Sequence, residues 1–351
     1  MKPQFLNLLN QNLNNSYVQY IQAQNFINPI QNLILQLLNS DDYPERNNLW
    51  NQIVGILNQT VEFEDGVNDL KAMSNPYYIG YGNPNADLLF VGLEKAIRLG
   101  DVVADEETES KLFFEESVNN IYHFQKLIDF FNLNLNHNIS DLNDILLNEF
   151  NYSILFPSQL ALQFRNHVPV WQNYSKYIAS RELNDIELYN ELHNEVNYYG
   201  KSFCSKCFMT ELFHEPSGRH NNNAVLNLER ARFLIDNSNF FKSFKTIFFT
   251  GKANLPNNIM VNNLSFTGID YIKNVFDVDD NLDMLEGLID DMDYNELINL
   301  IETGTITFLW KRNADNEIER ILVLTNFWGT GHISNDRIQL YSRISSRLIT
   351  N

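Results

Sequence analysis

The sequence predicts an α/β fold, namely a three-layer α/β/α sandwich with a short, mainly parallel central sheet. The first observation is that short, wholly apolar runs such as Leu88–Val91 end at a glycine or a turn, which is typical of parallel strands buried on both faces. The second is that longer segments between these runs carry Leu, Ile and Phe at spacings of three and four residues, which indicates helices. Strands that alternate with helices build α/β domains, and 351 residues that are 44% hydrophobic suffice for a full core.

The chain is expected to have two parts. Residues 1–70 are predicted to form a helical N-terminal region, because the apolar residues of segments such as FINPIQNLILQLLN recur with a helical period. Residues 71–351 are predicted to form the α/β domain. This domain is expected to carry helical insertions at about 101–200 and 277–302.

Four apolar runs predict the core strands of that domain, at 88–91, 208–212, 246–251 and 321–324. The last strand is the second arm of a hairpin that begins at Thr305. A stripe of apolar residues from Ile338 to Leu348 predicts a helix at 336–348 that closes the domain.

Acidic residues outnumber basic ones and are unevenly distributed. The chain has 25 Lys and Arg against 44 Asp and Glu, which gives a net charge of −19. This charge excludes a protein coated in positive charge, but it does not exclude DNA binding, which depends on local patches. Between Asp277 and Glu302 there are ten acidic residues and no basic one. We expect this stretch to be an exposed helical insertion away from any DNA, since carboxylates repel phosphates.

Composition also bears on compartment. No run reaches the ~18 apolar residues that a membrane span needs, and the segment MKPQFLNLLNQ lacks the pattern of a secretory signal. Two cysteines exclude a disulfide scaffold and fit a reducing compartment. We therefore expect a cytoplasmic protein without membrane attachment.

The two cysteines form a CxxC pair, Cys204 and Cys207. A structural zinc or iron–sulfur site needs about four ligands, and the sequence has no second pair. His214 and His220 could complete a zinc site, but two ordinary thiols are the better interpretation. We expect no metal and no other cofactor.

Several segments, in a particular order, resemble one known family. They are Asn83–Gly92, Val170–Tyr174, Met209–Leu212, Phe248–Lys252, and Leu322–Thr325 followed by Gly331–Ser334. Together they resemble the uracil-DNA glycosylase superfamily, in which an apolar strand ending in Val-Gly directly precedes the first catalytic loop. The resemblance covers roughly residues 75–95 and 165–350.

The resemblance implies a set of site residues. Glu94 holds the position of the polar residue in the first catalytic loop, where a carboxylate can stabilise a sugar cation or orient water. His332 holds the position of the histidine in the second loop and would hydrogen-bond the departing base, although Ile333 replaces the usual proline. Gly92 and Glu211 would contact the base.

Three further residues are implied as DNA contacts. Ser334 and nearby backbone amides would hold a phosphate, and Arg337 would meet phosphate because it is close to the second loop. Trp328 could stack on a base or wedge into the duplex. Alternatively, Arg337 lies with Arg343 and Arg347 on a solvated helix face, and Trp328 packs in the core.

Glu211 bears on the choice of base. In the family, an asparagine at the end of the second core strand reads uracil with both halves of its amide, and Glu211 takes its position. An ionised carboxylate has no hydrogen to donate to O4 of uracil, whereas the N4 amino group of a cytosine-type base suits an acceptor. The resemblance therefore implies a modified cytosine-type base rather than plain uracil. Alternatively, Glu211 is one position out of register and merely solvated.

The sequence thus favours a monomeric, monofunctional DNA glycosylase that flips its target base and hydrolyses the bond to deoxyribose. The long N-terminal region and insertions fit defence against phages with modified DNA. A uracil-specific repair glycosylase, or a non-catalytic nucleic-acid-binding module with the same fold, are the alternatives. A weaker alternative is an acidic interaction protein that mimics DNA.

Overall fold

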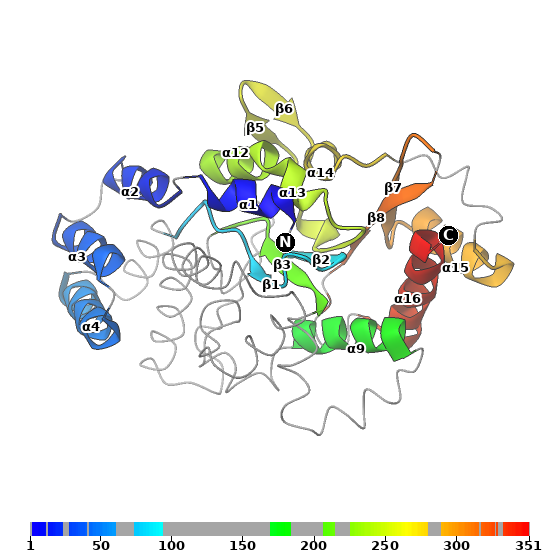
Figure 1. The fold of residues 1–351 in the computed structure, drawn as a ribbon, viewed down its shortest axis with the longest axis horizontal. Coiled ribbons are helices and arrows are strands. Elements are labelled where there is room, and N and C mark those ends of the chain that lie inside the picture. Colours follow the sequence, from blue (N-terminus) through cyan, green and yellow to red (C-terminus); the bar gives the residue numbers. More distant parts are fainter. Residues whose placement is uncertain are drawn as a thin grey trace.

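A six-stranded sheet forms the centre of the molecule (Figure 1). The computed structural model describes residues 2–11, 13–23, 28–40, 42–60, 74–93, 169–183, 206–214, 225–279, 289–315, 317–326, 328 and 333–350. In spatial order the strands are β1 (Tyr81–Gly82), β3 (Phe208–Glu211), β2 (Leu88–Gly92), β4 (Thr246–Thr250), β8 (Ile318–Thr325) and β7 (Thr307–Arg312). The four inner strands are parallel, and the two edge strands are antiparallel to their neighbours.

The predicted α/β class is confirmed, since the sheet is mainly parallel and helices connect its strands. Each inner strand lies where an apolar run predicted it. All five side chains of β4 are buried, as are the first four of β2. Strands with no exposed position cannot lie on the surface of a sheet, because both of their faces need cover.

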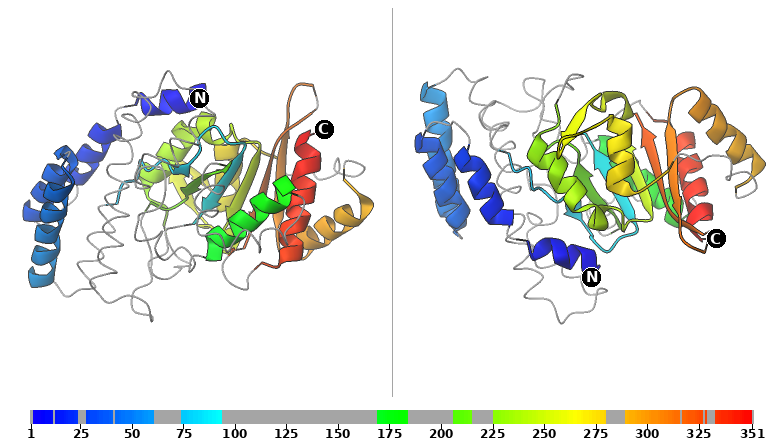
Figure 2. Two further views of the ribbon diagram at one scale, coloured as in Figure 1. Left: turned by 60° about the horizontal axis from the view of Figure 1, so that its bottom comes forward. Right: turned by 90° about the horizontal axis from the view of Figure 1, so that it is seen from above.

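Aromatic side chains fill the space on both faces of the sheet. On one face, the Phe90 ring stacks on Tyr174 of α9 (Pro169–Leu183) with ring centroids 3.8 Å apart. On the other face, Phe208 packs edge-on against Phe240 of α13 (Ser238–Phe241). Helix α16 (Asn335–Thr350) lies beside α9, whereas α12 (Leu228–Asp236) and α14 (Gly268–Phe276) lie with α13 (Figure 2).

Four helices precede the sheet: α1 (Pro3–Leu9), α2 (Leu13–Ala23), α3 (Asn28–Asn39) and α4 (Tyr43–Thr60). Helix α1 packs directly on the α/β domain, where the buried Phe5 ring lies 5.2 Å from that of Phe240. Beside it, Lys2 Nζ donates to the carbonyl of Ala86 (2.8 Å). Helices α2 to α4 extend away from the sheet (Figure 1).

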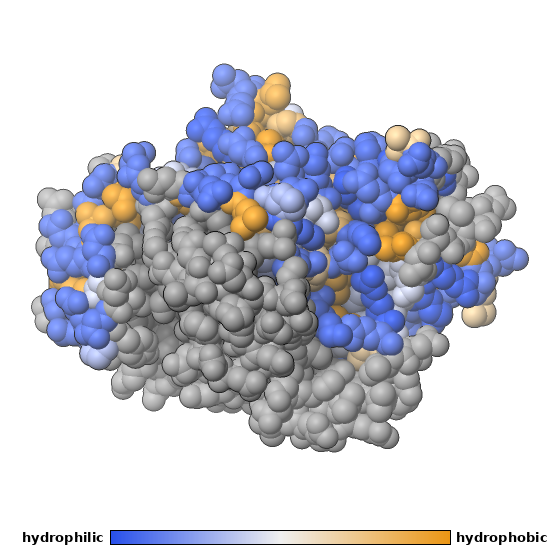
Figure 3. All heavy atoms as spheres, viewed as in Figure 1, coloured by the Kyte–Doolittle hydropathy of each residue, from blue (hydrophilic) through white to orange (hydrophobic). Residues whose placement is uncertain are grey.

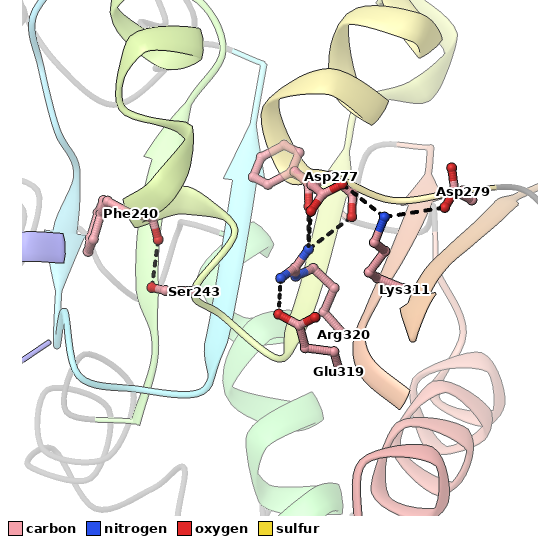
Figure 4. A network of polar contacts seen from close by, with 8 residues as sticks. Phe240, Ser243, Asp277, Asp279, Lys311, Glu319 and Arg320 are labelled. Atoms are coloured by element: carbon pink, nitrogen blue, oxygen red, sulfur yellow. Dashed lines mark hydrogen bonds and ion pairs between the residues drawn. The ribbon is translucent and has the colours of Figure 1, made fainter. Parts of the chain in front are cut away.

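The acidic stretch is not simply the exposed insertion that the sequence predicts. Helix α15 (Asp291–Glu302) buries Leu297 and Leu300, and its Asp293 is only 2% exposed. Upstream, Asp277 lies 3.1 Å from Lys311 of β7, and Arg320 of β8 donates to its carbonyl (Figure 4). Asp277 and Asp279 at the start of the stretch, and Asp290 and Asp293 further along it, are therefore paired with basic residues of β7, β8 and α16, while residues 280–288 lie outside the described residues.

A small hairpin was not predicted. Strands β5 (Ile259–Val261) and β6 (Leu264–Phe266) are joined by Asn262 and Asn263, both at positive φ, as a two-residue hairpin turn requires. Leu264 is 61% exposed, and Figure 3 shows apolar surface on this projection. None of the described helices is long and apolar enough to span a membrane.

Candidate functional site

The last residues of the four parallel strands form one row at the carboxyl edge of the sheet. Gly92 is in register with Glu211 on one side and with Thr250 on the other, and Thr250 is in register with Thr325. Each lies two residues beyond an apolar residue that faces α9, so the pleat directs the whole row to the α9 face. Ligands of open α/β sheets bind at this edge.

Glu211 and Gly92 form a close pair within the row. The Glu211 carboxylate lies directly over the α-carbon of Gly92, where a β-carbon would overlap Oε2 and Cδ. Any side chain at residue 92 would therefore displace the Glu211 carboxylate from this position. Glu211 is the final residue of β3 and is partly buried. The two residues predicted to contact the base thus lie together.

Tyr174 adds a buried hydroxyl to this row. Its OH lies 2.8 Å from Thr250 Oγ1, which in turn donates to the carbonyl of Val91 (3.4 Å). Burial raises the pKa of the Tyr174 phenol well above its ordinary value, and the Glu211 carboxylate raises the pKa further. The Tyr174 phenol therefore remains neutral and can donate a hydrogen bond, and it interacts electrostatically with the Glu211 carboxylate.

Trp328 belongs to the core, which corrects its assignment as a DNA contact. The side chain is 1% exposed, and its ring lies nearly parallel to that of Tyr341, at an angle of 12°. Its Nε1 donates to Thr325 Oγ1 (2.6 Å), and its carbonyl accepts from Asn173 (2.6 Å). A ring held in this way cannot stack on a base without leaving the core. The alternative interpretation, core packing, is the one that the structure supports.

The two predicted catalytic residues, Glu94 and His332, lie outside the described residues. In the sequence, Glu94 directly follows Leu93, whose carbonyl accepts from the Phe213 amide (2.7 Å) at the end of β2. His332 directly precedes Ile333, which packs against the core. Because β2 and β8 are parallel and separated only by β4, the chain leaves both strands at the same edge of the sheet.

The remaining predicted DNA contacts lie at the start of α16. Ser334 is exposed, and its Oγ accepts from the Arg337 amide (3.3 Å) as an N-terminal cap. The Arg337 side chain is partly buried. On the same helix, Arg343 and Arg347 form ion pairs with Asp293 and Asp290. Arg343 and Arg347 are therefore paired with carboxylates, and phosphate contact by Arg337 stays a prediction.

Sequence reasoning missed Arg230 of α12, which is completely buried beneath the end of β3. Its position could have been found from the helical pattern, since Arg230 lies three and four residues before the buried Phe233 and Leu234. A charged residue on an apolar stripe is seldom left without partners. Thr250 was placed in the third strand, but its contact with Tyr174 could not be read from the sequence.

Within the described ranges no group of His, Cys, Asp and Glu could hold a metal ion. The Cys207 side chain is buried, and Cys204 lies outside these ranges. Comparisons of the chain with protein-family models, curated proteins and solved structures found no match. Among the described residues, the carboxyl edge of the sheet offers one carboxylate acceptor, that of Glu211, and the hydroxyl groups of Tyr174, Thr250 and Thr325.

Proposed function

We propose that this chain is a monofunctional DNA glycosylase that hydrolyses the N-glycosidic bond of a flipped, modified cytosine-type base. The observation that carries the proposal is the Glu211 carboxylate, which lies against Gly92 at the carboxyl edge of four parallel strands. Its resemblance to the uracil-DNA glycosylase superfamily supplies the reaction class. Defence against phage DNA with modified bases, by a monomeric cytoplasmic enzyme, is part of the same proposal.

Recognition depends on the chemistry of a carboxylate acceptor. An ionised Glu211 accepts a hydrogen bond from the N4 amino group of a cytosine-type base, whereas O4 of uracil would meet another lone pair. A buried polar mismatch costs about 1–3 kcal/mol, which corresponds to a preference of roughly tenfold to a hundredfold. The absence of a side chain at Gly92 leaves the carboxylate room at the sheet edge.

Hydrolysis needs two further groups. As the bond between the base and C1′ breaks, positive charge develops on the sugar and negative charge on the base. Glu94 would stabilise the sugar cation and orient the attacking water, and His332 would donate a hydrogen bond to the departing base. The oxygen of water then bonds to C1′, and its proton leaves with the base. The parallel arrangement of β2 and β8 supports this assignment, because both loops begin at one edge.

Base release from defined duplexes tests the proposal. Mass spectrometry would follow release from DNA that contains uracil, cytosine or 5-substituted cytosines, for wild type, Glu94→Gln and Glu211→Asn. We expect the wild type to release a modified cytosine, Glu94→Gln to lose release by orders of magnitude, and Glu211→Asn to gain about tenfold or more on uracil relative to cytosine-type bases. Glu182→Gln, which changes a half-exposed carboxylate on α9, is the control.

Two outcomes would contradict the proposal in different ways. Efficient uracil release by the wild type would refute the choice of base but keep the reaction class. Tight binding of every duplex without release of any base would instead support a non-catalytic nucleic-acid-binding module.

A further inference from the structure

Arg230 is a fully buried cation held by neutral acceptors directly under the site. Its Nε donates to the carbonyl of Leu212 (3.3 Å), and its two terminal nitrogens donate to four more oxygen atoms. These belong to Pro76 (carbonyl, 3.2 Å), Tyr78 (carbonyl), Thr210 (Oγ1, 3.3 Å) and Glu211 (carbonyl). The five N–H groups of a guanidinium therefore match five acceptors.

These hydrogen bonds join two segments that are far apart in the sequence. One segment is 76–78, which leads into β1, and the other is 210–212, the end of β3 that carries Glu211. Thr210 extends the network, since its Oγ1 donates to the carbonyl of Ile79 (2.7 Å). A lysine ammonium has three donors and no planar fork, so only an arginine can hold both segments in this way.

The charge of Arg230 also acts on the site. Burial lowers its pKa to about 10, so the guanidinium remains charged at neutral pH, and the Glu211 carboxylate opposes this decrease. The interaction is mutual, since a nearby cation favours the ionised form of a carboxylate.

The other ionisable neighbours are neutral at this pH. Burial lowers the pKa of His214, which follows β3, to about 3, and Arg230 lowers it further. Burial raises the pKa of Tyr271 on α14, which interacts with Arg230, and that of Tyr174 on α9, which faces Glu211. Tyr78 also interacts with Arg230. Among these described neighbours, Arg230 is the one that brings positive charge to Glu211.

We propose that Arg230 is a positioning residue for Glu211: it fixes the end of β3 so that the carboxylate lies against Gly92, and its charge keeps that carboxylate an ionised acceptor. The role of Arg230 rests on the proposed function in one respect, namely that the ionised Glu211 carboxylate accepts a hydrogen bond from the amino group of a base at this partly buried place. The coupling between the two side chains, however, can be measured whether or not the protein releases a base.

The first test uses unmodified protein. In protein labelled with ¹³C in glutamate and ¹⁵N in arginine, the Arg230 Nε–H resonance should move at the pH at which the Glu211 carboxylate titrates. Glu211→Gln assigns the carboxylate and should make that resonance independent of pH over the same range. If the chemical shift of the Arg230 Nε–H group did not change as Glu211 titrates, the inference would be overturned.

The second test removes the guanidinium. In Arg230→Gln and Arg230→Lys, the titration midpoint of Glu211 should rise by about one pH unit in the first and by less in the second, which keeps a charge. Arg232→Gln is the matched control, since Arg232 lies on the same helix and pairs with Glu229 at the surface (3.2 Å). An unchanged midpoint in a folded Arg230→Gln variant would reduce Arg230 to a structural role. If that variant does not fold, the first test still decides.

Activity separates this inference from the proposed function. For a protein that releases cytosine-type bases, the acid limb of kcat/KM should move with the Glu211 midpoint in the Arg230 variants, and not in Arg232→Gln. If the wild type releases no base but the two resonances titrate together, the proposed function fails and the role of Arg230 stands. If bases are released without that coupling, the inference alone fails.

Discussion

Two single residues, Trp328 and His214, have roles that depend on burial rather than on position in the sequence. Trp328 follows a strand in a glycine-rich segment, where an exposed aromatic would suit DNA, yet its ring is surrounded by Phe90, Tyr174 and Tyr341. His214 follows β3 and is 3% exposed beside a buried guanidinium. Burial of an imidazole beside a cation favours its neutral form.

We predict that His214 makes the protein sensitive to acid. Its pKa is about 3 in the folded chain against an ordinary value of 6.5, so the unfolded chain binds the extra proton between these values. Stability is therefore complete above about pH 6.5 and falls as the pH decreases towards 3, by up to about 2 kcal/mol between pH 6.5 and 5. Urea denaturation at pH 7.5 and 5.0 should show a smaller pH-dependent loss for His214→Gln than for wild type. Equal losses would contradict the prediction.

At the scale of elements, ion pairs attach the acidic helix α15 to the arginine-rich helix α16. Arg343 contacts both carboxylate oxygens of the buried Asp293, at 2.8–3.2 Å. Arg347, one turn later, pairs with Asp290, and both of these side chains are largely in solvent. The acidic and the basic segments, which are separate in the sequence, are thus paired in the folded chain. These charges therefore act mainly on one another.

This pairing predicts unequal effects for two neighbouring arginines. Arg343→Ala leaves the buried Asp293 carboxylate without its bidentate partner and should lower the free energy of unfolding by about 2 kcal/mol. Arg347→Ala should change it barely detectably, since exposed ion pairs contribute little. Chemical denaturation of the two variants, one turn apart on one helix, measures the difference. Equal destabilisation would mean that Asp293 does not depend on Arg343.

At the scale of the whole molecule, the first helix packs into the same hydrophobic core as the sheet. Phe5 and Leu8 are buried in the main core, and Gln11 donates to the Asn237 side chain beside α13 (2.6 Å). Tyr20 of α2 accepts from Asn227 at the start of α12 (3.4 Å). These contacts run from both of the first two helices to the domain.

We therefore expect Phe5→Ala to destabilise the entire chain by about 3 kcal/mol, because it removes a fully buried ring. Unfolding followed by tryptophan fluorescence and by circular dichroism should shift to the same lower midpoint. Asn7→Ala, at an exposed position of the same helix, should leave both midpoints in place. If the Phe5→Ala variant kept the wild-type fluorescence transition, α1 would be an appendage.

Short apolar runs determined the inner strands, because a run such as Leu88–Val91 with no polar position has to be covered on both faces. The sequence by itself also placed Glu211 within the second predicted strand, at 208–212, but left open whether its carboxylate lies in the site or in solvent. Strand order, the close contact of Glu211 with Gly92 and the burial of Trp328 were decided only by tertiary structure. Each depends on contacts between residues far apart in the chain, as when Arg230 meets the carbonyl of Tyr78 across 152 positions. Local patterns indicate which residues are apolar or charged, but the residues that bury a tryptophan or hydrogen-bond to a buried arginine are brought together only by folding.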